Sequence, residues 1–207
     1  RQLTVGHKSC DNTITCRDET FVCTAGPGKE CRLTCDGTGA CRDMTYTCAA
    51  GSICTVDCGG TTEKHEVCRG LTVHGEAAAS LAFTASDGHI GDRVGYQANI
   101  FCPSSHSGAA STSAGSSGEL PCTLHCGSGS DKAAHTCQDM KVMAASGSTD
   151  LSVTCTGLGQ YTCWNMDVNA SAVSSNVNVD CTGCARQLGC CGVRCSGDDY
   201  TGIRPAT

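Results

Sequence analysis

A short segment built around cysteine recurs along the chain at nearly constant spacing, and this repeat constrains the fold more than any other feature. The segment reads Cys-x-Asp-Met or a close variant, and its first cysteine falls at positions 16, 41, 68, 137, 163 and 190. Successive copies are 25 to 27 residues apart, except between Cys68 and Cys137, where Gly95 occupies the position of a missing cysteine. Periods of this length are typical of solenoids, in which each repeat packs on its neighbours.

Each repeat contains two stretches in which apolar and polar residues alternate. The first has the form Cys31-x-Leu33-x-Cys35, and it recurs from Cys54, Leu81, Cys122, Leu151 and Val177. The second follows the repeated cysteine, as in Met44-Thr-Tyr46-Thr-Cys48. Strict alternation indicates a strand with one buried face. We therefore expect residues 1–207 to form a single all-β domain, a disulfide-clamped parallel β-solenoid of about seven rungs with two short strands each.

The strand pattern also predicts how the cysteines pair. Two cysteines four residues apart on one strand are separated by ~13 Å, whereas the Cα atoms of a disulfide lie within ~7 Å. Each cysteine must therefore bond across a turn. The nine predicted pairs are Cys10–Cys16, Cys23–Cys31, Cys35–Cys41, Cys48–Cys54, Cys58–Cys68, Cys102–Cys122, Cys126–Cys137, Cys155–Cys163 and Cys181–Cys190. Where one member of such a pair is absent the other is absent too, as at Ala85 and Gly95.

Three cysteines remain outside these pairs: Cys184, Cys191 and Cys195. Because the chain has 21 cysteines, an odd number, at least one must be free or bonded to another chain. A zinc site formed by these residues with Cys190 is an alternative. We favour disulfides, because so many cysteines indicate an oxidising compartment and hence an extracellular or cell-surface protein.

Composition narrows the function classes. The chain has 26 Gly but only three Phe, four Tyr and one Trp, so cross-links are expected to replace part of the apolar core. A net charge of −6 argues against nucleic acid and anionic membranes as partners. No apolar run is long enough to span a membrane. The sequence contains no phosphate loop, dinucleotide fingerprint, HExxH or nucleophile elbow, so we expect no cofactor and no catalytic residues.

Two features predict a surface that carries a loop insertion and a glycan. Residues 103–121, between Cys102 and Cys122, read PSSHSGAASTSAGSSGELP, a composition that cannot pack a core and predicts a flexible or glycosylated loop insertion. The chain also has one N-glycosylation sequon, Asn169-Ala170-Ser171. Alternation from Val168 predicts that the Asn169 side chain points outward, so Asn169 is a candidate glycan site.

The ends of the sequence suggest an extended array. Residues 1–5, RQLTV, match residues 69–73, RGLTV, so we expect the sequence to open inside a strand. No helical cap is recognisable at either end, although an uncovered rung offers unpaired backbone groups to other strands. One interpretation is a fragment of a longer array, and the other is a subunit that docks head to tail with copies of itself.

Metal binding, catalysis and ice binding are weaker alternatives. Asp or Asn recurs two residues after the repeated cysteine, at Asp18, Asp43, Asp139 and Asn165, with Gly70 once. A carboxylate row could bind Ca²⁺, but substitution by Gly favours a left-handed turn position, and we predict no metal site. The acids are dispersed, unlike those of polysaccharide-cleaving β-helices, so we predict that the chain is not an enzyme. Outward positions such as Arg32, Asp57 and His125 are too mixed for the threonine array that binds ice.

The alternating units, with phrases such as Asn99-Ile-Phe-Cys-Pro103 and Cys122-Thr-Leu-His-Cys126, resemble Cys-rich repeats in large secreted surface proteins of algae and other protists. The resemblance covers most of the chain and implies an extracellular structural role, such as a mastigoneme-like filament. The odd cysteine count and the degenerate rung at 75–102 depart from the pattern. No functional residues come with the resemblance, because a structural repeat supplies none.

The function expected from the sequence is therefore an extracellular structural protein, a subunit of a filament, flagellar hair, sheath or stalk that assembles end to end. The alternative is a cell-surface binding or adhesion module that presents loops, chiefly residues 103–121, to glycans or a partner protein.

Overall fold

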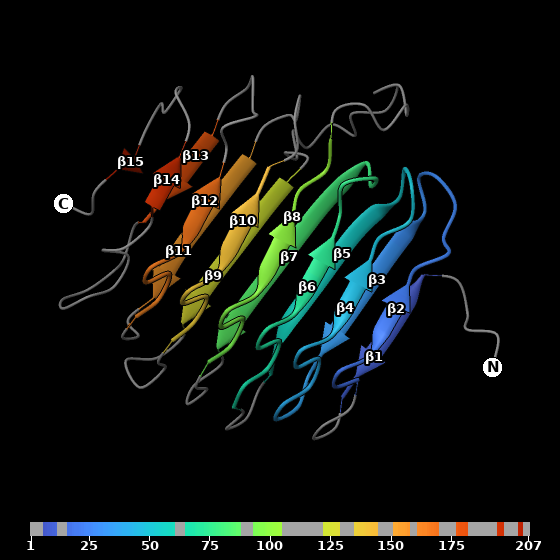
Figure 1. Ribbon diagram of the computed structural model, residues 1–207, viewed down its shortest axis with the longest axis horizontal. Helices are drawn as coiled ribbons and strands as arrows, with labels where there is room; N and C mark the ends of the chain where they lie inside the picture. Colours follow the sequence, from blue (N-terminus) through green and yellow to red (C-terminus); the bar gives the residue numbers. More distant parts are fainter. Residues whose placement is uncertain are drawn as a thin grey trace.

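The computed structural model is a parallel β-solenoid. It describes residues 6–11, 16–60, 65–87, 93–104, 122–128, 135–144, 151–157, 161–169, 177–181, 194–196 and 203–204. The strands of these residues form two sheets, one of eight strands and one of seven, and neighbouring strands in each sheet run parallel. Figure 1 shows these two layers running from the blue strands to the red ones. The predicted fold class is confirmed.

The chain alternates between the two sheets, so that each coil contributes one strand to each. The eight-stranded sheet has the order β1 (His7–Cys10), β3 (Glu30–Cys35), β5 (Ile53–Gly60), β7 (Ser80–Asp87), β9 (Cys122–Ser128), β11 (Leu151–Gly157), β13 (Val177–Asp180) and β15 (Ile203–Arg204). The seven-stranded sheet has the order β2 (Thr20–Val22), β4 (Thr45–Thr47), β6 (Thr72–His74), β8 (Asn99–Phe101), β10 (Lys141–Met143), β12 (Asp167–Asn169) and β14 (Arg194–Ser196).

Equivalent residues of successive coils are register partners, and each set of partners forms a column along the solenoid axis. In the eight-stranded sheet, Leu33 pairs with Val56, which pairs with Phe83. In the seven-stranded sheet, Tyr46 pairs with Val73. All of these side chains are buried. The core is therefore a set of apolar columns between two thin sheets, and the alternation in the sequence decides which residues enter it.

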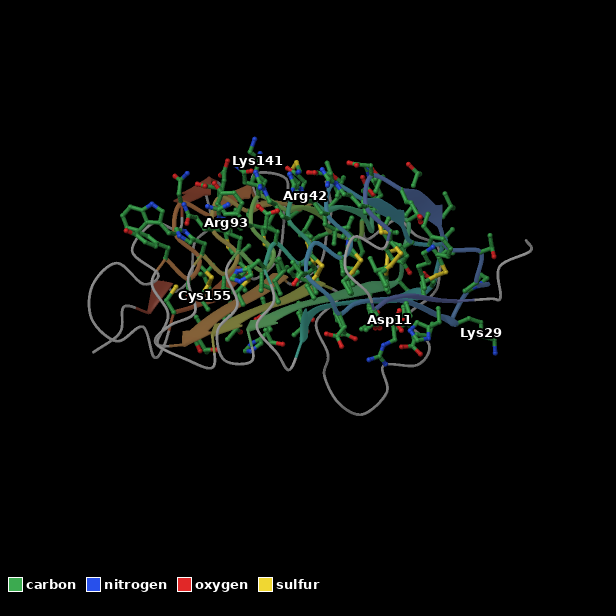
Figure 2. All side chains as sticks on the ribbon, turned by 90° about the horizontal axis from the view of Figure 1, so that it is seen from below. Asp11, Lys29, Arg42, Arg93, Lys141 and Cys155 are labelled. Carbon is green, nitrogen blue, oxygen red and sulfur yellow. A yellow bond between two sulfur atoms is a disulfide. The ribbon has the colours of Figure 1, made fainter. Side chains whose placement is uncertain are left out.

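Among the described residues, eight disulfides close turns between the sheets. They are Cys10–Cys16, Cys23–Cys31, Cys35–Cys41, Cys48–Cys54, Cys58–Cys68, Cys102–Cys122, Cys126–Cys137 and Cys155–Cys163, with Cα–Cα distances of 5.7 to 6.3 Å. Each joins the two members of a pair expected from the sequence, and Figure 2 shows their sulfur atoms between the two layers. The ninth expected pair includes Cys190, which lies outside the described residues, and its other member, Cys181, is buried.

The degenerate coil keeps the register of its neighbours. Ala85, which replaces a cysteine, pairs with Cys58 on one side and Cys126 on the other. Likewise, β8 pairs in register with both β6 and β10. The absence of a disulfide between positions 85 and 95 therefore leaves the stacking regular, because backbone pairing and the buried columns continue through this coil.

Candidate binding surface

The turns that enter the seven-stranded sheet share an alternating backbone. In the described coils the repeated cysteine is left-handed, with φ from +52° to +58°, and the residue two positions later is left-handed as well. That second position holds Asp18, Asp43, Gly70, Gln97, Asp139 and Asn165. The turn interpretation of the recurring Asp and Asn is thus confirmed. Hydrogen bonds between coils, such as Asp43 N–H to Arg69 O at 2.8 Å, offset the cost of this conformation.

The side chains of these turns already have partners that compete with a metal ion. Asp18 pairs with Arg17 at 3.3 Å, and Asp43 pairs with Arg42 at 3.2 Å. Within the described residues, the only compact group of three potential metal ligands is Cys35, Cys58 and Cys68. All three are in disulfides, so none offers a thiolate.

One glutamate, Glu66, forms ion pairs with three arginines that come from three successive coils. The Glu66 carboxylate contacts Arg69 in its own coil, Arg42 at 2.6 Å and Arg93 at 3.4 Å. Partial burial acts to raise the pKa of Glu66, but the hydrogen bond and charge of Arg69, with Arg42 and Arg93, outweigh it and lower that pKa. Glu66 therefore stays ionised and links the three coils electrostatically.

An aromatic ladder continues along the same turns toward the later coils. Arg69 and Arg93 lie over the Tyr96 ring, at 5.8 and 6.0 Å from its centroid. His135 stacks on Tyr161 at 4.9 Å. Two edge-to-face contacts complete the ladder: Tyr96 with His135 at 6.4 Å and Tyr161 with Trp164 at 6.1 Å. All of these rings are half-buried, so each keeps part of its surface in solvent.

A shallow polar groove of about 420 Å³ lies beside this ladder, on the outer face of the seven-stranded sheet. Its lining comes from two columns: Gln97, Asp139 and Asn165 of the turns, and Asn99, Lys141 and Asp167 of β8, β10 and β12. Lys141 is the register partner of both Asn99 and Asp167. Asn165 donates a hydrogen bond to Asp139 at 2.6 Å, which fixes the middle of the groove. Arg42, Arg93 and Lys141 project from the same side of the solenoid (Figure 2).

A charged pair occupies the core side of the first described coil. Lys8 is the register partner of the buried Leu33, and Glu19 holds the turn position that Met44 holds in the next coil. The Lys8 ammonium pairs with Glu19 at 3.1 Å and lies 5.7 Å from the centroid of the Phe21 ring. Inward-pointing charges on an edge strand discourage indiscriminate strand pairing. This pair was not predicted from the sequence.

Two other residues singled out in the sequence, Asn169 and Cys195, lie in strands of the seven-stranded sheet. The Asn169 side chain at the end of β12 is exposed, as the alternation predicted. Cys195 lies in β14, opposite Val168. Cys184, Cys191, residues 1–5 and residues 105–121 lie outside the described part of the chain.

Neither the Glu66 network nor the aromatic ladder was predicted from the sequence. The sequence does carry a signal at the position directly after the repeated cysteine, or after Gly95 in the degenerate coil. That position holds Arg17, Arg42, Arg69, Tyr96, Gln138 and Trp164. Comparing this position across the repeats, together with the position two residues before the cysteine, would have identified the residues of the network and of the ladder.

Comparison with known protein families, with curated protein sequences and with solved structures finds no match to this chain. Its function is therefore inferred from the surfaces described above.

Proposed function

We propose that the chain is an extracellular structural protein, a solenoid module of a filament, hair, sheath or stalk that associates end to end with copies of itself. The observation that carries the proposal is the parallel stacking of β1 through β15 in two sheets, with eight turns of the described coils closed by disulfides. Such bonds persist outside the reducing cytosol. Solenoids of this kind extend by adding coils, because each coil contacts only its neighbours.

The edge strands provide the chemistry for end-to-end contact. Among the described residues, β1 has a partner on one side only, and β15 is the opposite edge strand of the same sheet. Val22 of β2, at the edge of the other sheet, is 55% exposed. The Lys8–Glu19 pair would make such a junction selective, because a neighbour that buried the pair without hydrogen-bonding it would lose free energy.

Surface binding is the second candidate function. The loop at 103–121 that first suggested it lies largely outside the described residues. The observation that favours it is the polar groove beside the aromatic ladder. A glycan at Asn169, whose side chain is exposed on the same sheet, would fit either role. The described residues include no helix long and apolar enough to cross a membrane.

Electron microscopy of the native, unreduced protein tests the structural proposal, together with sedimentation at low and high salt. We expect filaments, or oligomers that grow with protein concentration at low and at high salt, because edge strands join through backbone hydrogen bonds that salt screens little. Discrete single particles at all concentrations would overturn end-to-end assembly and leave surface binding as the better candidate.

A further inference from the structure

We propose that the polar groove over β8, β10 and β12 binds a linear neutral glycan that lies along the solenoid axis. The site is the outer face of the seven-stranded sheet together with the aromatic ladder that borders it. This inference does not depend on end-to-end assembly, because the groove spans three coils in the middle of the described stack.

The groove presents the functional groups that recognise sugar hydroxyls. The carboxylates of Asp139 and Asp167 accept hydrogen bonds, Lys141 donates them, and the amides of Gln97, Asn99 and Asn165 do both. A hydroxyl is itself both donor and acceptor, so a polyol can satisfy this mixed set where a simple anion or cation could not. Gln97, Lys141 and Asp167 are exposed, so they can reach a ligand without rearrangement of the core.

The spacing of the coils suits a chain of sugars. Asn99, Lys141 and Asp167 are register partners in successive strands, so the groups repeat along the axis at the strand spacing of ~4.8 Å. That spacing is close to the length of one pyranose unit in a linear polysaccharide. A glycan aligned with the axis would therefore place one ring over each coil and meet two polar side chains at each.

The aromatic ladder supplies apolar surface at the edge of the groove. Tyr96 directly precedes Gln97, and Trp164 directly precedes Asn165, so each ring adjoins a groove residue. Tyr161 packs edge-on against Trp164, which fixes the orientation of both rings. The negative face of an aromatic ring attracts the polarised C–H groups on one face of a sugar. Polar groups on one side and rings on the other make an amphipathic site that matches the two faces of a pyranose.

Charge decides between neutral and acidic glycans. The six lining residues carry one positive and two negative charges, for a net of −1, which disfavours a polyanion. The nearby arginines are already engaged: Arg42, Arg69 and Arg93 all contact Glu66. The groove therefore favours an uncharged chain.

Intrinsic fluorescence and titration calorimetry of the full chain test the proposal. Trp164 is the only tryptophan, so its emission reports directly on the groove edge. The probes are neutral linear hexasaccharides of glucose, mannose and galactose, with an oligogalacturonate of the same length as the acidic comparison. We expect at least one neutral probe to change Trp164 emission and to bind with little dependence on salt, because counterion release accompanies only charged ligands.

Variants locate the site. Asp167→Ala and Trp164→Phe should each weaken binding about tenfold, the scale of one lost hydrogen bond or stacking contact. Thr45→Ala is the matched control, because Thr45 holds the column of Asn99, Lys141 and Asp167 two strands before the groove, and it should bind as the native chain does. Native disulfides, checked by non-reducing peptide mapping, establish that a variant is folded. Binding of the acidic probe alone, binding unchanged in both groove variants, or no binding of any neutral probe would overturn the proposal.

Discussion

Gly95 faces Ala85 across the one described turn into the seven-stranded sheet that lacks its disulfide. A Cβ atom on Gly95 would lie 3.2 Å from the Cβ of Ala85, slightly closer than the usual Cβ–Cβ separation of about 3.5–4.5 Å in a disulfide. Gly95 has φ +64°, in the left-handed region that the cysteines of this column also occupy. The degenerate coil thus keeps the geometry of a disulfide without the sulfur atoms.

The double variant Ala85→Cys with Gly95→Cys is therefore expected to form an additional bridge. Closing a loop of this length should raise the free energy of unfolding by about 2–3 kcal/mol, less the left-handed backbone cost at residue 95. Mass spectrometry of unreduced peptides checks the bond, and urea unfolding checks the gain. The single variant Gly95→Cys is the control and should be less stable than the native chain. Two alkylatable thiols in the oxidised double variant would contradict the prediction.

Tyr46→Phe should leave the protein as stable as before or up to about 1 kcal/mol more stable. The Tyr46 hydroxyl is buried with no hydrogen-bond partner among the described residues, so its removal relieves a desolvation cost. Its ring stacks on Phe21 at 5.7 Å, a contact that Phe preserves. Denaturant unfolding with disulfides intact measures the difference. Ile100→Ala in the same column is the control, with an expected loss of about 2–5 kcal/mol. A clear loss in Tyr46→Phe would mean that the hydroxyl is hydrogen-bonded.

Acid should weaken the protein through Glu66. Its pKa in the folded state is below the ordinary value of 4.5, so the stability it supplies is complete above that pH and is lost as pH falls through the folded-state pKa. Glu66→Gln should therefore be less stable than the native chain at neutral pH, and the gap should close below pH 4.5. Unfolding free energies at several pH values measure this, with Glu76→Gln, outside the network, as the comparison. If the difference in unfolding free energy did not change with pH, the ionised carboxylate of Glu66 would not be the source of the stability.

Replacing the charged pair by the residues of the next coil, Lys8→Leu with Glu19→Met, should make the edge at β1 and β2 apolar. We expect stronger self-association that salt does not reverse, because the charges that discourage strand pairing are gone. Sedimentation at low and high salt measures the species present. Lys29→Leu is the control, since Lys29 is an exposed residue outside this pair. An unchanged size distribution in the double variant would show that the pair does not limit association.

Much of the fold was predictable because each coil repeats the same local rules. Alternation in Cys31-x-Leu33-x-Cys35 identified the buried face of β3, and the length of that strand prevented Cys31 from bonding Cys35. The absence of cysteine at both Ala85 and Gly95 supported the pairing of cysteines across this turn. These inferences need only the rise of a strand and the reach of a disulfide.

The candidate surface was not predictable in the same way, because its residues are distant in sequence and their contacts depend on how coils stack. Arg42, Glu66 and Arg93 come from three coils, and only their turns in three dimensions bring them together. The same holds for His135 and Tyr161, whose rings stack across neighbouring coils.

The sequence by itself determined the period, the buried faces and the disulfide partners, because strand geometry and covalent reach act over short segments. The tertiary structure alone decided which outward side chains meet. Parallel pairing brings positions 23 to 42 residues apart to about one strand spacing, ~4.8 Å. That juxtaposition produces the Glu66 network and the polar groove from residues that each look like ordinary surface positions in the sequence.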